Sequence, residues 1–292
     1  MTLDQLKIFV AVAEREHVTR AAEALNLTQS AASAAIAGLE QQFGLKLFDR
    51  IGRGIVLTEA GSLLLGEARA TLARAHAAEI AMMEQAGLNR GRLTLCASQT
   101  ISSYFLPRKL VKFHAQYPGI ELIVSVGNTA QVARAVQDGA AEIGFVEGPV
   151  TDPNLAVEAV GVDQMIVVVP PGHRWAGQTH IPTRELAEEN WISREEGSGT
   201  RDAFVRALEA LGLPANKLHI SISLPSNEAV RAAVEEGAGA AALSSLVCAE
   251  SLKTKALAQA NLTLPARTFS AVQHNQRYRS RAAAALLATI RQ

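Results

Sequence analysis

The sequence predicts an α/β protein in three parts, and three patterns along the chain carry this prediction. Residues 1–58 hold three short helical patterns and then two short alternating segments. Residues 59–90 form one continuous helical pattern, and residues 91–292 alternate short apolar segments with helical ones, which predicts parallel α/β units. A chain of 292 residues also exceeds what one hydrophobic core usually organises, so several domains are expected.

Composition describes an alanine-rich globular chain, with 48% hydrophobic and 19% charged residues. No apolar run approaches the roughly 20 residues that span a bilayer, and the start of the chain lacks a signal-peptide cleavage pattern. We therefore expect a cytoplasmic protein with no membrane partner. The net charge is zero, and the first 60 residues hold six Lys and Arg against seven Asp and Glu. Binding of nucleic acid must therefore depend on local placement of charge rather than on a basic domain.

The first three helical patterns form a helix-turn-helix. In the first pattern, which ends near Arg15, apolar residues recur at i, i+3, i+4 and i+7. Thr19 is expected to cap a short second helix, and Asn26 to leave that helix through a left-handed turn. Thr28 is expected to cap the third helix.

The third helix has an apolar stripe and a polar face. The predicted stripe consists of Ala32, Ile36, Leu39 and Phe43. The other face holds Gln29, Ser30 and Ser33, which allow close approach to a DNA major groove, and the Gln29 amide suits bidentate bonding to adenine. An ordinary amphipathic helix with a solvated face is the alternative.

Residues 46–58 alternate as two short strands around a tight turn at residues 52–54. This hairpin would hold Arg53 at its tip, beside Arg50. Such a wing places arginine at the phosphate backbone or in a narrow minor groove. A hairpin with solvated arginines is the alternative.

The helical stretch from Thr58 to about Leu88 approximates a heptad seam. The seam residues are Leu65, Ala68, Leu72, Ala75 and Met82, with a break at Glu79. A helix this long and half apolar needs a partner, so we interpret it as a dimerising linker. Packing against its own C-terminal domain is the alternative.

Six apolar segments predict strands in the third part, at residues 92–97, 120–126, 141–146, 164–170, 218–224 and 239–243. Helices are predicted through Leu110 and Phe113 and from Thr129, Thr200 and Ser226. Cys96 and Cys248 lie far apart in apolar surroundings, which favours buried reduced thiols over a disulfide or metal site, with a redox switch as the alternative.

The stretch from Phe9 to Gly61 resembles the helix-turn-helix and wing of LysR-type transcriptional regulators. The family's recognition pattern stands at Thr28–Ile36 with Leu39-Glu40, and its LFDR and LTEAG blocks follow. Positions 34 and 35 are both alanine, where many members carry longer side chains, which shifts base reading toward other residues. The candidate DNA-binding residues are Thr19, Arg20, Thr28, Gln29, Ser30, Ser33, Arg50 and Arg53.

The resemblance implies a winged helix-turn-helix over 1–58, a linker helix over 59–90 and a periplasmic-binding-protein-like domain over 91–292. That domain would have one subdomain at about 92–161 plus 266–292 and another at about 162–265. The partners implied are double-stranded promoter DNA and further copies of the chain, as a homodimer through the linker and a homotetramer. RNA polymerase is a further candidate partner. A ligand between the subdomains would shift their closure and thereby the packing of the dimers.

Polar residues stand at four predicted helix starts, where unpaired N–H groups and the helix dipole favour an anion. Capping alone explains a polar residue at any single helix start. Four such starts at the carboxyl ends of strands, however, favour a ligand in the crevice at that edge of the sheet. The candidate ligand-binding residues are Ser98, Gln99, Thr100, Thr129, Glu147, Ser198, Gly199, Thr200 and Asn227. The segments REEGSGTR, GNT and GFVEGP resemble the branch of the family that senses inorganic or compact organic anions, including sulfite-responsive members. An ionised Glu147 would repel an anion unless paired, so its role is assigned to selectivity or to bonding between the subdomains.

The sequence offers no catalytic residues, metal site or cofactor site. The histidines are scattered without ligand spacing, Ser198 stands in no GxSxG pattern, and the glycine-rich EGSGTR lacks the ending of a phosphate-binding P-loop. We therefore expect a ligand-responsive regulator rather than an enzyme. An enzyme or solute-binding protein built on the α/β domain is the alternative, as is a sensor domain that a protein partner occupies.

Overall fold

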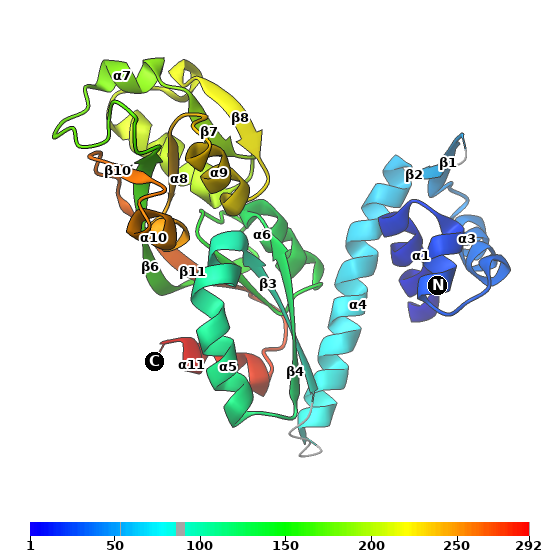
Figure 1. Cartoon of the computed structure of the whole chain (residues 1–292). Helices are drawn as coiled ribbons and strands as arrows, with labels where there is room; N and C mark the ends of the chain where they lie inside the picture. Colours follow the sequence, from blue (N-terminus) through cyan, green and yellow to red (C-terminus); the bar gives the residue numbers. More distant parts are fainter. Residues whose placement is uncertain (53, 86–90, 292) are drawn as a thin grey trace. The chain divides into compact units, whose positions relative to one another are not determined.

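The computed structural model describes residues 1–52, 54–85 and 91–291 (Figure 1). The chain forms two compact units, the first covering Met1–Gly87 and the second most of Leu88–Gln292. Each unit has its own hydrophobic core, so each is described by itself.

The first unit consists of helices and one hairpin. Its elements are α1 (Leu3–Arg15), α2 (Val18–Ala24), α3 (Gln29–Phe43), β1 (Phe48–Ile51), β2 (Gly54–Leu57) and α4 (Glu59–Gln85). Thr28 caps α3 through a hydrogen bond from the N–H of Ala31, and Asn26 has the predicted left-handed backbone, with φ of 55°. The prediction for Thr19 as a cap was wrong: His17 caps α2, because its ring accepts from the N–H of Arg20 and the helix starts one residue before Thr19.

The core of this unit holds Leu6, Phe9, Val12, Ala21, Ile36, Leu39 and Leu47. Phe43 was predicted to join it but is 48% exposed. Phe43 is the last residue of α3, and the chain turns away from the helix in a left-handed conformation at Gly44. Leu47, beyond this turn, is buried instead of Phe43. On α4, Ala68 is buried whereas Met82 is 71% exposed, so the apolar seam lacks full cover within one chain.

The second unit contains a seven-stranded sheet in the order β10-β6-β11-β5-β3-β4, with β9 also paired to β6, and a separate pair β7-β8. The strands are β3 (Gly91–Ser98), β4 (Ile120–Gly127), β5 (Ile143–Val146), β6 (Leu155–Val169), β7 (Trp191–Arg194), β8 (Ile220–Leu224), β9 (Ala241–Ser244), β10 (Ala258–Ala260) and β11 (Ala266–His274). The helices are η1 (Ile101–Phe105), α5 (Leu106–Gln116), α6 (Thr129–Asp138), α7 (Thr183–Glu188), α8 (Gly199–Ala210), η2 (Ala215–Lys217), α9 (Asn227–Glu235), α10 (Ser245–Lys253) and α11 (Arg281–Arg291).

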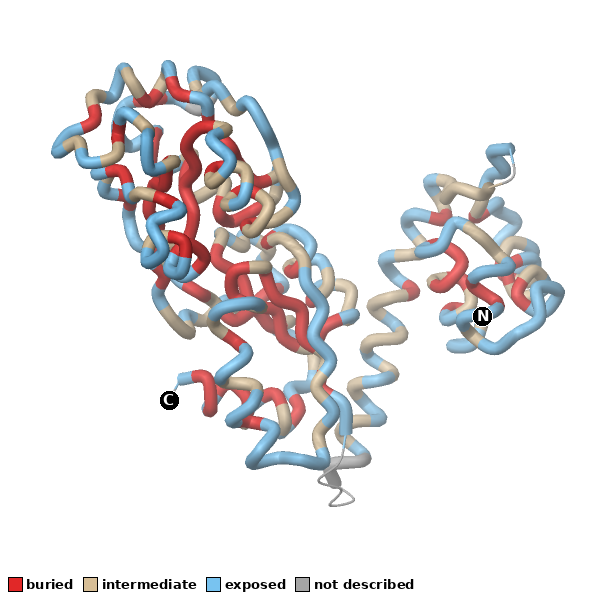
Figure 2. Tube along the Cα trace, in the orientation of Figure 1, coloured by how far each residue is buried: buried red, intermediate tan, exposed pale blue. Residues whose placement is uncertain are grey.

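The strands form two lobes, which two long antiparallel strands connect. In the first lobe, Phe113, Phe145 and Leu286 pack around parallel strands β3, β4 and β5. In the second lobe, Trp191 and Phe204 lie in the core around β6, β7 and β9. Residues 155–164 of β6 pair with β11 along the full length of β11. Strand β6 contributes to the cores of both lobes, whereas Phe269 and Ala271 of β11 belong to the core of the first lobe. Residues 165–169 of β6 are all buried (Figure 2).

The expectation of parallel units holds for β3 with β4 and β5 and for β7 with β8. It was wrong for the predicted strands in β6 and β9, which pair antiparallel. Strands β10 and β11, which were not predicted, also pair antiparallel. Only the second half of β6 was predicted from the sequence, because its apolar run is continuous, whereas its first half alternates buried and exposed residues. Strand β11 was not predicted, although its first residues alternate in the same way, a pattern typical of a half-buried strand. These two strands bring polar side chains to the region between the lobes.

Candidate functional site

The start of α3 presents hydrogen-bonding side chains to solvent. Gln29 donates from Nε2 to Oγ of Ser33 over 3.1 Å, and the Oγ atoms of Thr28 and Ser30 lie 3.0 Å apart. Thr28, Gln29 and Ser30 are exposed and Ser33 is half-buried. The buried residues of α3 face the core, so this helix end is available to a partner.

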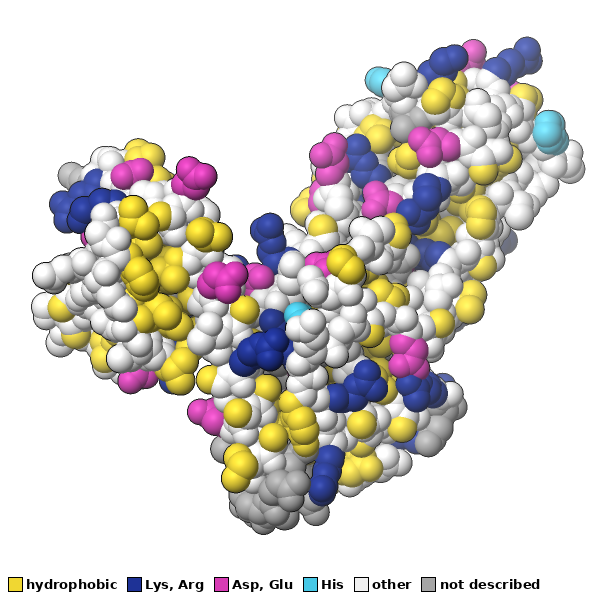
Figure 3. Space-filling view, turned by 180° about the vertical axis from the view of Figure 1, so that it is seen from behind, with side chains coloured by type: hydrophobic (Ala, Val, Ile, Leu, Met, Phe, Trp, Pro, Cys, Tyr) yellow, Lys and Arg dark blue, Asp and Glu magenta, His cyan; other side chains and the backbone are white. Residues whose placement is uncertain are grey.

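Thr19 and Arg20 on α2 and Arg50 on β1 are also exposed. The eighth predicted DNA-binding residue, Arg53, lies outside the described residues. On the face that Figure 3 shows, Lys and Arg side chains form small separated groups with Asp and Glu among them. This distribution agrees with the zero net charge. Binding of DNA would therefore depend on individual residues rather than on a large basic surface.

In the second unit, the predicted polar helix starts are buried rather than solvated. Ser98 ends β3, Thr129 begins α6, Ser198 precedes α8 and Asn227 begins α9, and each is at most 4% exposed. Burial of polar groups requires hydrogen-bond partners, so the partners of these residues are informative.

Hydrogen bonds join the start of η1 in the first lobe to the start of α9 in the second. Oε1 of Gln99 accepts from the N–H of Asn227 over 2.7 Å, and its Nε2 donates to Glu228 over 2.6 Å. Nδ2 of Asn227 donates to Oγ1 of Thr100 over 2.9 Å. These contacts hold the two lobes together, so three of the predicted ligand residues act between the lobes.

Two other predicted residues have no partner. In the part of the chain that the structure describes, Oγ1 of Thr129 and Oγ of Ser198 are buried and form no hydrogen bond. Ser198 stands at the N-cap position of α8, yet its side chain makes no capping bond. Capping therefore does not explain Ser198, whereas it does explain Ser226, which accepts from the N–H of Ala229.

The starts of α6 and α8 approach closely. A Cβ atom added to Gly199 would lie 2.7 Å from Oγ1 of Thr129 and 2.7 Å from the backbone N of Gly148. No real side chain accepts such contacts, so glycine is required at position 199. The starts of the two helices are therefore crowded beside the two unpaired hydroxyls.

Buried charges surround these starts and were not predicted from the sequence. Arg267 on β11 donates from Nε to Asp163 over 2.7 Å and from Nη1 to Oγ1 of Thr200 over 3.0 Å. Ser244 donates to the other Asp163 oxygen over 2.6 Å. Arg194 donates from Nη1 to Oδ1 of Asn227 over 2.8 Å. Recognition of β11 as a strand would have been needed to find Arg267.

Glu147 is buried beside this network. Its Oε2 accepts from Oγ of Ser98, and its Oε1 lies 3.9 Å from Nη1 of Arg267. Burial raises the pKa of Glu147, and the positive charges of Arg267 and Arg194 only partly oppose this. The neutral carboxyl form is favoured relative to an exposed glutamate, which reduces its repulsion of an anion.

Comparisons with known proteins assign the chain to a family. The model of the LysR substrate binding domain matches residues 86–292, and that of the bacterial regulatory helix-turn-helix protein, lysR family, matches residues 3–62. The chain belongs to the LysR family. The predicted family, the two-domain fold class and the function as a DNA-binding transcriptional regulator are thereby confirmed.

Relatives of this LysR-type regulator match it along nearly all of its length. The uncharacterized HTH-type transcriptional regulator YeiE of Escherichia coli K12 is 36% identical, over 97% of this chain and 94% of its own. A full-length OxyR variant from Pseudomonas aeruginosa shares the fold, with a TM-score of 0.74 at 24% identity, over 100% of this chain and 95% of its own. The Synechocystis PCC6803 CcmR regulatory domain, solved in complex with 2-PG, matches with a TM-score of 0.63 at 26% identity, over 69% of this chain and 96% of its own.

The family models and relatives describe regulators rather than enzymes. Within the described residues of this LysR-type regulator, no group of three or more His, Cys, Asp or Glu is placed to hold a metal ion. Of the helices that the structure describes, none has the length and apolar character needed to cross a bilayer.

The two cysteines lie in different hydrophobic cores of the regulator. Burial raises the pKa of both thiols, that of Cys248 to about 12 and that of Cys96 above its ordinary value. The reactive thiolate is therefore disfavoured at both positions, which argues against the redox switch left open by the sequence.

Proposed function

We propose that this LysR-type regulator binds a compact anion between the two lobes of its C-terminal domain and that the bound anion changes its affinity for promoter DNA. The observation that carries the proposal is the pair of buried, unpaired hydroxyls of Thr129 and Ser198. An unsatisfied buried hydroxyl costs about 1–3 kcal/mol, so its retention at a helix start is explained by a guest that accepts its hydrogen bond.

The chemistry of the surroundings favours an anion. The starts of α6 and α8 place the positive ends of two helix dipoles at Thr129 and Ser198. Two buried arginines, Arg194 and Arg267, lie in the adjoining network. The close approach of Gly199 to Thr129 favours a guest of few atoms, such as an inorganic oxyanion. CcmR, whose regulatory domain was solved with 2-PG, supports the use of such a domain for a small ligand.

The lobes are held together by bonds that a ligand would alter, such as that from Asn227 to Thr100. A ligand that binds one degree of closure more tightly shifts the population toward it. We propose that this shift reaches DNA through an oligomer, a homodimer through α4 and then a homotetramer, that acts on chromosomal DNA in the cytoplasm alongside RNA polymerase. Exposed Leu63 and Met82 on α4 support a partner for this helix.

A crystal of the full chain soaked in sodium selenate tests the proposal, because selenium gives an anomalous signal. We expect a peak with oxygens about 3 Å from Oγ1 of Thr129 and Oγ of Ser198. In crystals of Thr129→Val the peak should weaken or vanish. A peak elsewhere only, or one that Thr129→Val leaves unchanged, would contradict the proposed site.

A further inference from the structure

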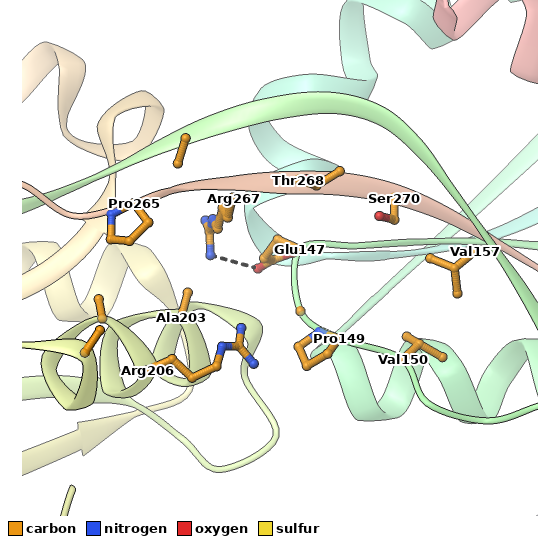
Figure 4. A pocket seen from close by; sticks show the side chains of 14 residues that line it. Glu147, Pro149, Val150, Val157, Ala203, Arg206, Pro265, Arg267, Thr268 and Ser270 are labelled. Atoms are coloured by element: carbon orange, nitrogen blue, oxygen red, sulfur yellow. Dashed lines mark ion pairs between the residues drawn. The ribbon is translucent and has the colours of Figure 1, made fainter. Parts of the chain in front are cut away.

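A cavity of about 460 Å³ borders Glu147 and Arg267, but Thr129 and Ser198 do not line it (Figure 4). Its volume lies in the range of small-molecule sites. The walls are mostly apolar, with side chains of Pro149, Val150, Val157, Ala203, Ala207 and Pro265. It is therefore a distinct space that adjoins the place where the unpaired hydroxyls lie, since a Cβ atom added to Gly148 in its wall would lie 2.9 Å from Oγ1 of Thr129.

The walls come from both lobes. Pro149 and Val150 follow β5 in the first lobe, whereas Ala203 and Arg206 lie on α8 in the second. Strand β11, which connects the lobes, forms a third wall. A molecule in the cavity contacts both lobes at once.

Arg206 lines the cavity as an exposed side chain, one helical turn after Asp202 on α8. Figure 4 shows Arg206 extending from α8 toward Pro149. Among the described residues, Arg206 forms no hydrogen bond or ion pair. Arg267, by contrast, is paired with Asp163 over 2.7 Å. Burial raises the pKa of Glu147 above its ordinary value, and its Oε1 lies 3.9 Å from Nη1 of Arg267. Arg206 is thus the available charge, at the edge of an apolar space.

We propose that this cavity is a second ligand site, which binds a small monocarboxylate with a branched aliphatic or aromatic body. The carboxylate pairs with the guanidinium of Arg206, since arginine matches the planar fork of a carboxylate. The apolar body packs against the prolines, valines and alanines of the wall. Because both lobes line the cavity, its occupancy favours one degree of lobe closure.

Isothermal titration calorimetry of the full chain with 4-methylpentanoate and with benzoate tests this site. We expect binding of at least one probe with one molecule per chain. Arg206→Gln should weaken it about tenfold or more, as expected for loss of a charged hydrogen bond, and Ala203→Leu should weaken it by filling the cavity. The uncharged 4-methylpentanamide should bind about tenfold more weakly than its acid.

Two controls keep this site distinct from the anion site. Arg184→Gln removes an exposed arginine of α7 and should leave binding unchanged. Thr129→Val should also leave carboxylate binding unchanged, while it weakens binding of selenate. Absence of binding by both carboxylates would overturn the proposal. So would binding that Arg206→Gln leaves intact, or that Thr129→Val abolishes.

Discussion

Arg267 donates from Nε to Oδ2 of Asp163 over 2.7 Å, and both side chains are almost fully buried. The pair joins β11 to β6 in the region between the lobes, and Arg267 also reaches Thr200 and Thr100. One guanidinium therefore links both connecting strands to two of the polar helix starts. These contacts of Arg267 hold the region between the lobes together.

Removal of one partner from this pair should destabilise the domain strongly. Arg267→Ala leaves Asp163 buried without its counter-charge, and we expect a loss of about 3–5 kcal/mol in the free energy of unfolding by urea. Arg291→Ala is the matched control, because its pair with Glu158 is largely exposed, and it should cost less than about 1 kcal/mol. Equal losses in the free energy of unfolding would show that the buried pair contributes no more to stability than the exposed pair.

Thr129→Val and Thr100→Val should have opposite effects on stability. Without ligand, Thr129→Val removes an unsatisfied buried hydroxyl, so the free energy of unfolding should stay unchanged or rise by about 1 kcal/mol. Thr100→Val removes the acceptor of bonds from Asn227 and Arg267 and should cost about 1–3 kcal/mol. Urea titrations of both variants without added anions measure this, and a destabilised Thr129→Val would argue that its hydroxyl has an ordinary structural role.

Glu147→Gln should flatten the pH dependence of stability. Because burial raises the pKa of Glu147 in the folded state, the folded chain holds this proton more tightly than the unfolded chain. The resulting stabilisation is fully present below the ordinary pKa of 4.5 and is lost as the pH rises through the raised folded value. The wild type should therefore lose stability relative to Glu147→Gln over that window, in thermal unfolding followed against pH. A difference in unfolding temperature between the wild type and Glu147→Gln that stays constant with pH would contradict this role of Glu147.

Anion binding should follow the same titration. Ionisation of Glu147 adds negative charge beside the site, so selenate affinity of the wild type should fall as the pH rises through the raised pKa. Affinity of Glu147→Gln should change less over the same range. If selenate affinity fell more steeply with pH in Glu147→Gln than in the wild type, Glu147 would be excluded as the cause of the pH dependence.

Gln29→Ala should relax sequence preference in DNA binding. If the Gln29 amide bonds to a base edge, its loss should reduce discrimination at particular base pairs by about 1–3 kcal/mol. Arg50→Ala should instead weaken binding to all sequences and lower the slope of log affinity against log salt by about one for a lost phosphate contact. Binding to a panel of operator variants at several salt concentrations separates the two, and a uniform loss for Gln29→Ala would argue against base reading.

The helix-turn-helix was predictable because its signals are local. Thr28 caps α3 and Asn26 turns the chain through hydrogen bonds and backbone angles that depend on near neighbours. His17 shows the limit: an imidazole that caps a helix is uncommon, so Thr19 was favoured. Phe43 shows a second limit of prediction from local signals. The direction in which the chain leaves α3 decides whether its ring is buried, and the helical pattern does not show that direction.

The polar helix starts of the cleft were predictable for the same reason, since polar caps follow apolar strands. The sequence placed Ser98, Thr129 and Ser198 at element boundaries, but it did not show which hydroxyls would lack partners. The buried charges Asp163 and Arg267 were not predictable. They lie in strand segments that were not predicted, and their pairing joins positions 104 residues apart.

We propose that an anion at Thr129 and Ser198 controls DNA binding. The most direct test of this proposal measures affinity of the purified chain for DNA from upstream of its own gene while sulfite, sulfate, selenate and phosphate are titrated at constant ionic strength. We predict that at least one anion changes the affinity about fivefold or more, and that Thr129→Val abolishes this change while it retains DNA binding. No change in affinity with any of these anions, or the same change in Thr129→Val, would contradict control of DNA binding by an anion at this site.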